Sequence, residues 1–355
     1  MPGSAMRLWL ERILLKTWQR QGALACLLLP LAALVRGIAA LRRMLYSTGV
    51  FPVQRVNTMV IVVGNVITGG AGKTPTVISL VRHLRDQGVQ VGVISRGYGR
   101  KSYATLEVTP QTAVDDAGDE PLLVRRATQA PVWVGRSRLE CATALLAKYP
   151  QTDILVCDDG LQHYGLYRDL EVCVFDNRGT GNGWTLPAGP LRESWPRQAF
   201  TAAGQALDRL LVLHTGDRPA FDGFTAQRQL AELAVLQNGS TLALSSLRAT
   251  RGKPLMAVAG IAQPEVFFAM LRGCGLPLVK TLALPDHYNF DSYSRNAYAG
   301  YQLICTEKDA AKLWNFVPDA IAVPLVQTAE PAFWQAIDAH VAHRLRRQPT
   351  AKLSS

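Results

Sequence analysis

Short apolar runs alternate with segments of helical periodicity along most of the chain. The runs are rich in Val, Ile and Leu and have strand length, at residues 60–63, 89–94, 154–157, 171–175 and 210–213. Strands that alternate with helices predict a parallel sheet covered by helices on both faces.

The alternation breaks between residues 216 and 252, where short pieces flank Asn238-Gly239, a strong hairpin signal. This stretch predicts a linker or a small sheet. A second α/β unit then begins at the apolar run 255–260, continues with a helix over 264–272, and reaches another strand at 301–305.

The first 46 residues have a different pattern, in which Arg and Lys alternate with Leu, Ile and Trp. The uncharged run at 23–35 is interrupted by Pro30 and is shorter than the ~20 residues of a spanning helix. A signal peptide fits the shape, but no small-residue cleavage site stands out. We expect an amphipathic anchor at a membrane surface, and the alternative is a helix packed on the protein's own core.

Residues 60–85 have the order of a strand, a phosphate-binding loop and a helix. The loop reads T-G-G-A-G-K-T, with Ile67 where the common pattern has glycine and Thr68 where a variant ATPase class has lysine. Lys73 is predicted to contact the β- and γ-phosphates and Thr74 to ligate magnesium. A glycine turn before an ordinary helix is the alternative. The predicted nucleotide-binding residues are Gly69, Gly70, Ala71, Gly72, Lys73, Thr74 and Pro75.

Several charged residues follow predicted strands, where ligands of open α/β sheets gather. Asp158 and Asp159 end the strand at 154–157, which suits a magnesium-assisted phosphate site. Arg96 and Arg100 follow the strand at 89–94, where a solvated basic turn is an equal alternative. Asp119, before Glu120-Pro121, is either a helix cap or a carboxylate presented to a pocket.

The composition and charge of the chain indicate which classes of partner it binds. The chain has 355 residues, 48% hydrophobic and 18% charged, and a formal charge of +11, which favours a nucleotide, nucleic acid or an acidic membrane surface. No aromatic stacking signature or groove-reading helix supports nucleic acid. The six cysteines contain no C-x-x-C pair, so reduced thiols in the cytosol are expected.

The motifs together resemble one family, the tetraacyldisaccharide 4'-kinases of lipid A biosynthesis. The resemblance covers residues 28–313 and rests on G-N-V-I-T-G-G-A-G-K-T-P, S-R-G-Y-G-R, G-D-E-P, D-D-G-L-Q-H, P-A-G-P-L-R-E, V-A-G-I, P-D-H-Y-N-F and T-E-K-D-A-A-K-L, in that order. It implies an ATP- and magnesium-dependent enzyme, peripheral on the cytoplasmic face of the inner membrane. The implied acceptor is the 4'-hydroxyl of a tetraacylated glucosamine disaccharide 1-phosphate.

The resemblance also implies an α/β architecture with a P-loop NTPase-like parallel-sheet domain, a two-stranded linker and a smaller C-terminal α/β domain. We expect amphipathic N-terminal helices over 1–50, the kinase domain over 51–217, the linker over 218–252, the second domain over 253–345 and a flexible tail over 346–355. An anchored monomer is expected.

Site residues carry over motif by motif. Lys73 and Thr74 match the phosphate and metal positions, and Asp158 and Asp159 match an acidic pair, with Asp158 taken as the magnesium ligand. Asp119 of G-D-E-P and His287 of P-D-H-Y-N-F match a dyad that prepares the sugar hydroxyl; which of them takes the proton stays open. The predicted catalytic residues are Asp119, His287, Lys73 and Asp159.

Three arginines are further candidate site residues, and one position differs from the family motif. Arg96, Arg100 and Arg192 are candidates for the substrate's 1-phosphate or the transferring phosphoryl group, since guanidinium groups bind such oxygens in pairs. Tyr288 stands where many relatives have a second histidine, which leaves a role for that position in doubt.

Two other functions compete with a lipid kinase. A membrane-associated regulatory P-loop ATPase would share the loop and the anchor, but it needs no distant Asp/His pair and usually carries lysine at the position of Thr68. A soluble small-molecule kinase would not need the apolar N-terminus.

Overall fold

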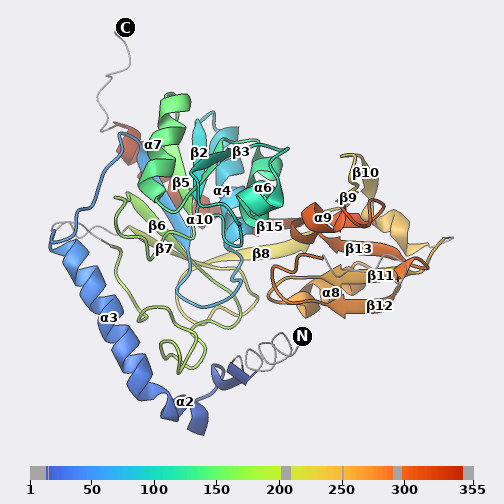
Figure 1. The fold of residues 1–355 in the computed structure, drawn as a ribbon, viewed down its shortest axis with the longest axis horizontal. Helices are drawn as coiled ribbons and strands as arrows, with labels where there is room; N and C mark the ends of the chain where they lie inside the picture. Colours follow the sequence, from blue (N-terminus) through green and yellow to red (C-terminus); the bar gives the residue numbers. More distant parts are fainter. Residues whose placement is uncertain (1–12, 15, 201–208, 250–251, 291–297, 347–355) are drawn as a thin grey trace.

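A computed structural model describes residues 13–14, 16–200, 209–249, 252–290 and 298–346. It contains a nine-stranded and a six-stranded sheet, which form a large and a small lobe (Figure 1). The predicted α/β class is confirmed. Residues 1–12 of the predicted anchor and 347–355 of the predicted tail lie outside the described residues.

The large lobe is built on parallel strands with antiparallel edges. Its order is β15-β8-β7-β6-β1-β5-β2-β4-β3, in which the β8–β15 and β3–β4 pairs are antiparallel. The strands other than β8 and β15 are β1 (Met59–Gly64), β2 (Val91–Ser95), β3 (Leu106–Val108), β4 (Val132–Val134), β5 (Ile154–Asp158), β6 (Leu170–Phe175) and β7 (Leu210–His214). Every residue of β1, β5 and β6 is buried, as expected for central strands covered on both faces.

Helices cover both faces of this sheet. On one face, Val77 and Leu80 of α4 (Lys73–Asp86) share a core with Leu122 of α6 (Asp119–Thr128). On the other face, Leu145 of α7 (Arg138–Lys148) packs with Leu191 from the Gly/Pro-rich loop. The short helix α5 (Val114–Ala117) precedes α6. The sheet therefore has a separate apolar core on each side.

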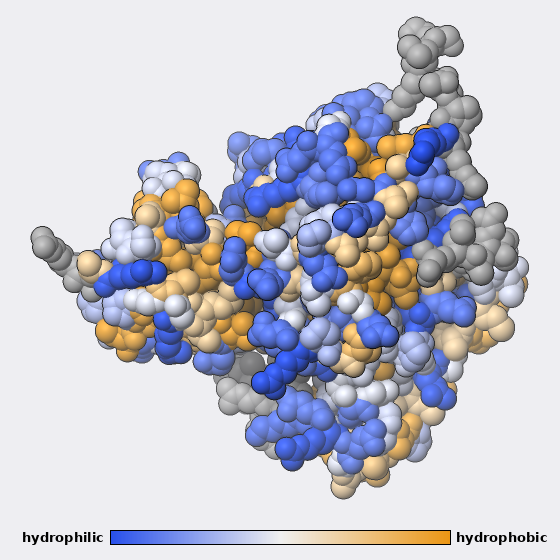
Figure 2. Space-filling view, turned by 180° about the vertical axis from the view of Figure 1, so that it is seen from behind, coloured by the Kyte–Doolittle hydropathy of each residue, from blue (hydrophilic) through white to orange (hydrophobic). Residues whose placement is uncertain are grey.

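The small lobe has the strand order β10-β9-β14-β13-β11-β12. These are β9 (Leu233–Val235), β10 (Thr241–Ala243), β11 (Leu255–Ala259), β12 (Leu278–Ala283), β13 (Gln302–Thr306) and β14 (Ile321–Val323). Its helices are η1 (Leu244–Arg248), α8 (Pro264–Gly273) and α9 (Glu307–Leu313). Phe268 of α8 is fully buried on one face of the sheet and Leu313 of α9 on the other. Seen from behind, this lobe projects to the left of the main body (Figure 2).

The chain crosses between the lobes on two paired strands. These are β8 (Phe224–Leu230) and β15 (Leu325–Ala329), antiparallel with Leu230 opposite Leu325. This differs from the expected linker at 218–252, because the second crossing strand comes from the far side of the small lobe. Residues 233–243, also assigned to the linker, form the β9–β10 edge of the small sheet.

The C-terminal helix also departs from the expected boundary at residue 345. Helix α10 (Pro331–Arg346) belongs to the large lobe, where Phe333, Ile337 and Val341 join the same core as α4. Their spacing of four residues predicts an amphipathic helix but does not say which sheet its apolar face covers.

The N-terminal helices extend along the outside of the large lobe (Figure 1). They are α2 (Ala23–Leu27) and α3 (Leu29–Ser47), in which Ala25 and Ala32 are the buried residues. Large apolar side chains are exposed along both: Leu24, Leu27, Leu29, Leu31, Leu34, Ile38, Leu41 and Met44. Among the described helices, none has the length and hydropathy to cross a membrane.

Candidate active site

The phosphate loop is shaped by glycines that side chains would not allow. Gly69 and Gly72 have φ of 90° and 86°, in the left-handed region that favours glycine. A Cβ on Gly72 would lie 2.9 Å from the hydroxyl oxygen of Thr215, which itself donates to the carbonyl of Ala71 at 3.0 Å. The loop thus lies against the residue that follows β7, and α4 begins directly after it at Lys73.

An arginine that the sequence analysis did not assign supports this loop from the side. Arg178 donates to the carbonyl oxygens of Thr68 and Gly70, each at 3.0 Å, and its guanidinium pairs with buried Asp176 at 2.9 Å. Asp176 also accepts a 2.7 Å hydrogen bond from Gln263 of the small lobe. The available signal was an apolar strand that ends in aspartate two residues before an arginine.

Asp158 ends β5 beneath the loop and is 2% exposed. Its Oδ2 accepts from Ser95 at 3.2 Å, whereas its buried Oδ1 has no partner among the described residues. Burial, and then the carboxylates of Glu120 and Asp159, raise the pKa of Asp158 to about 7. A carboxylate oxygen left without a donor is suited to a cation.

A magnesium site here would use few protein ligands. Thr74, in the first turn of α4, offers a hydroxyl, and Asp158 offers a carboxylate at the end of β5, opposite Val63 of the strand that leads into the loop. Within the described residues no cluster of three or more His, Cys, Asp or Glu forms a metal cage. Magnesium bound to a nucleotide usually takes one or two protein ligands and fills its remaining positions with phosphates and water, so the pair fits.

Asp159 faces two cations. It has φ of 48°, and its carboxylate lies 3.6 Å from Nζ of Lys73 and 3.3 Å from Arg192. Burial raises the pKa of Asp159, but Lys73 and Arg192 outweigh burial and hold it below its usual range. Lys73 also donates to Oδ1 of Asn65 at 3.3 Å. The lysine is therefore positioned by two oxygens at the mouth of the loop.

Asp119 and His287 meet across the two lobes, although 168 positions separate them. Asp119 begins α6 after Gly118 and is 3% exposed. Its Oδ2 lies 2.9 Å from Nδ1 of His287. Burial raises the pKa of Asp119, but the hydrogen bond from His287 and the charges of two nearby lysines outweigh burial and hold it well below its usual range.

His287 has a constrained backbone on the small-lobe side. Its φ is 59°, and its N–H donates to the carbonyl of Gly260 at 3.1 Å and to Oδ1 of Asp286 at 3.0 Å. The ring of Tyr98, from the large lobe, lies 5.1 Å from the imidazole. An energetically unfavourable backbone conformation that is held this firmly places the side chain accurately.

Two lysines of α9 complete the contacts between the lobes. Lys312 donates to Oδ2 of Asp119 at 2.9 Å, and Lys308 to Glu120 and Asp286, each at 3.2 Å. They belong to the recognised motif T-E-K-D-A-A-K-L but were given no role from sequence. Their spacing of four residues, which puts both on one helix face, was the signal.

One cavity of about 840 Å³ lies between the lobes, and many of these groups line it, whereas Asp119, Asp158 and Lys312 lie outside its lining. That volume is in the range of small-molecule sites. The large lobe contributes residues 68–75 together with Ile78, Tyr98, Glu120, Asp159 and Arg192. The small lobe contributes Ile261, Val266, Phe267, Met270, Asp286, His287 and Lys308.

The three candidate arginines lie in different places. Arg192 lines the cavity. Arg100 donates to the backbone carbonyls of Ala104 at 2.8 Å and Val134 at 3.4 Å, outside the cavity lining, and burial lowers its pKa. Arg96 is exposed and also lies outside the lining. Of the three, the arginine of the long loop after β6 lines the cavity, and the two arginines that follow β2 do not.

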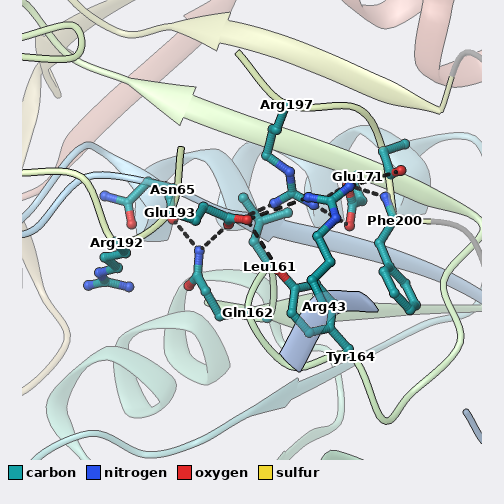
Figure 3. A network of polar contacts seen from close by, with 12 residues as sticks. Arg43, Asn65, Leu161, Gln162, Tyr164, Glu171, Arg192, Glu193, Arg197 and Phe200 are labelled. Atoms are coloured by element: carbon teal, nitrogen blue, oxygen red, sulfur yellow. Dashed lines mark hydrogen bonds and ion pairs between the residues drawn. The ribbon is translucent and has the colours of Figure 1, made fainter. Parts of the chain in front are cut away.

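A polar network connects the N-terminal helices to the phosphate loop (Figure 3). Glu193 accepts from Gln162 at 2.8 Å and from Arg197 at 2.9 Å, and lies 3.6 Å from Arg43 of α3. Gln162 also donates to the carbonyl of Asn65 at 3.1 Å. Two side chains thus join α3 to the residue that holds the lysine of the loop.

This chain is similar to known proteins in sequence and in fold. Residues 24–342 match the family model of LpxK, tetraacyldisaccharide-1-P 4'-kinase. A tetraacyldisaccharide 4'-kinase of Polaromonas naphthalenivorans (strain CJ2) is 52% identical over 347 residues, which cover 96% of this chain and 98% of that protein. One from Acidovorax sp. (strain JS42) is 53% identical over 327 residues, covering 92% and 93%. Among solved structures, LpxK from Aquifex aeolicus in complex with ATP aligns with a TM-score of 0.75 and 26% identity, over 90% of this chain and 99% of that chain.

Proposed function

Because the chain belongs to the tetraacyldisaccharide 4'-kinase family, we propose that the cavity between its lobes is the place of phosphoryl transfer. The chain is an ATP-dependent kinase of lipid A biosynthesis, which transfers the γ-phosphate to the 4'-hydroxyl of a tetraacylated disaccharide 1-phosphate. The observation that carries the proposed site is His287, which pairs with Asp119 and lines the same cavity as the phosphate loop.

The loop end of the cavity holds the triphosphate. Its backbone and the first turn of α4 offer N–H groups and a positive helix end, and Lys73 adds a charge. Thr74 and Asp158 would hold magnesium, which neutralises charge on the phosphate oxygens. Asp159 lies 3.6 Å from Lys73 and is itself paired with Arg192, so the carboxylate positions the lysine beside the cavity.

The small-lobe end prepares the acceptor. Asp119 engages Nδ1 of His287, which fixes the ring orientation and leaves Nε2 to accept the proton of the 4'-hydroxyl. The alcohol oxygen then attacks the γ-phosphorus in line with the departing ADP. In this assignment Asp119 orients and His287 accepts the proton.

The disaccharide carries four acyl chains, and we propose that the enzyme meets it peripherally at the cytoplasmic face of the inner membrane. The exposed apolar residues of α2 and α3 are accompanied by exposed Arg36 and Arg42, the pattern of a helix that lies in the headgroup region. Since one chain supplies all the site residues, we propose that it acts as a monomer.

The assignment of residues is tested with labelled ATP and tetraacyldisaccharide 1-phosphate in mixed micelles. His287→Ala and Asp119→Ala are expected to lose most turnover while ATP still binds, and Lys73→Ala to weaken ATP binding itself. Normal turnover in His287→Ala would reject the proposed base. ATP hydrolysis without label on the lipid would instead support a regulatory ATPase.

A further inference from the structure

The Nε2 atom of His287 has a charged neighbour. Nζ of Lys308 lies 3.4 Å from it, while Nδ1 on the other side of the ring lies 2.9 Å from Asp119. An ammonium group donates hydrogen bonds and has no lone pair to accept one. The two contacts therefore require a single tautomer, in which Nδ1 carries the proton and Nε2 the lone pair.

Lys308 is held firmly in this position. Its Nζ lies 3.2 Å from Glu120 of the large lobe and 3.2 Å from Asp286 beside the histidine, and its side chain is 14% exposed. Burial lowers the pKa of Lys308, but Glu120 and two aspartates outweigh burial and raise it above its usual value. The group at Nε2 is thus an ammonium and a permanent donor.

We propose that Lys308 is a positioning residue of the transfer step, which keeps His287 in the tautomer whose Nε2 accepts the hydroxyl proton. The inference rests on the proposed role of His287. In the step, the 4'-oxygen loses its proton to Nε2 and bonds to the γ-phosphorus, and the bond from phosphorus to the β–γ bridging oxygen breaks, leaving its electron pair on ADP.

The three contacts of Lys308 Nζ also indicate how the substrate hydroxyl can reach Nε2. The hydroxyl has to replace Lys308 at Nε2, and this contact is the longest of the three that Nζ makes. The two carboxylates retain the lysine next to the reacting group. Its positive charge then remains near the phosphoryl oxygens, where charge develops during transfer.

The other charged and polar groups around the imidazole act elsewhere on it. Lys312 donates to Asp119 and to the backbone carbonyl of His287, on the Nδ1 side. Asp286 lies 3.9 Å from Nε2, beyond hydrogen-bond distance, and Tyr98 contacts the ring. Among the residues that the structure describes, Lys308 is the donor at Nε2.

The kinetic test compares Lys308→Met, Lys308→Arg and a control, Lys280→Met, in the full-length enzyme with mixed micelles. Lys280 is an exposed lysine on the edge strand β12 of the same lobe. We expect Lys308→Met to lower kcat about tenfold to a hundredfold, with KM for ATP and lipid changed less than about threefold. Lys308→Arg should restore most of kcat, and Lys280→Met should match the parent enzyme.

A spectroscopic test separates this role from support of the fold. With ¹⁵N-labelled histidine, the imidazole nitrogens of His287, assigned by their loss in His287→Asn, should report one tautomer in the parent enzyme and a mixture in Lys308→Met. Unchanged kcat or an unchanged tautomer in Lys308→Met would overturn the inference while leaving the base intact. Full activity of His287→Asn would instead overturn the proposed role of His287 as the base.

Discussion

Replacing Asp119 by asparagine is a demanding test of the site, because it keeps the shape of the side chain and removes its charge. The carboxylate accepts from Nδ1 of His287 and from Lys312, each at 2.9 Å, and from the N–H of Glu120 at 2.9 Å. An asparagine has a single acceptor oxygen for these three donors. Its NH2 group is itself a donor and faces the donors that the oxygen cannot serve. Its amide would favour the imidazole with the proton on Nε2, the form that cannot accept the hydroxyl proton.

The expected loss of turnover follows from this change. A positioned base contributes typically 10²–10⁴-fold, so we expect kcat of Asp119→Asn to fall about a thousandfold, or about 4 kcal/mol. ATP affinity should stay within about threefold, since the carboxylate lies outside the phosphate loop. Label transfer to the lipid measures kcat, and equilibrium ATP binding is the control. A variant that keeps a tenth or more of parental turnover would contradict the assigned role.

The same substitution predicts a pH-dependent loss of stability. The pKa of Asp119 is depressed in the folded state, so its ionised form stabilises the fold above the unfolded pKa near 3.8, and this contribution disappears as the pH falls through the folded value. Leaving a buried ion pair half-paired costs about 3–5 kcal/mol. The gap in unfolding free energy between the parent and Asp119→Asn should therefore be full at pH 7 and narrow below pH ~4. A gap that widens on acidification would refute this sign.

Three further substitutions test other parts of the structure. Gly72→Ala should weaken ATP binding at least about tenfold, as measured by ATP titration. The φ of 86° disfavours alanine by about 1–2 kcal/mol, and the new Cβ would lie 2.9 Å from a threonine hydroxyl. Arg178→Met should lower both Tm and ATP affinity, because Asp176 loses its cation and two carbonyl oxygens of the loop lose their hydrogen-bond donor. Thermal melts with and without ATP measure both effects. Leu34→Glu with Ile38→Glu should reduce sedimentation with anionic vesicles at unchanged Tm, because these side chains are 60% and 59% exposed.

The sequence predicts those features of the site that are local. The strand, loop and helix over residues 60–85 follow from apolar run, glycines and periodicity, and the structure has β1, the loop and α4 in that order. Asp158 was placed correctly at the end of a buried strand for the same reason. Each of these needs only the residues adjacent to it in the chain.

Local sequence patterns do not predict the features that depend on tertiary packing. Helix α10 has an ordinary amphipathic pattern, and its place on the large lobe follows from the return of the chain along β15. Arg100 and Arg192 both lie in glycine-containing loops, yet the first guanidinium binds backbone carbonyls and the second lines the cavity. The contacts of Lys308 form only because α9 packs next to the first residues of α6, which local sequence does not predict.

The crossing strands also determine which part of the site is fixed. Gln327 of β15 donates to the hydroxyl of Thr76 at 2.7 Å, and Ser79 donates to the carbonyl of Gln327 at 2.8 Å. Both partners lie on α4, so the strand that returns from the small lobe is attached to the helix that begins at the phosphate loop. Movement of the small lobe about these strands would change the position of His287 relative to the loop, and it would also break the contact of Gln263 with Asp176. Because Asp119 and His287 lie on different lobes, such a movement would break their contact, and the proposed transfer would require the lobes to be together.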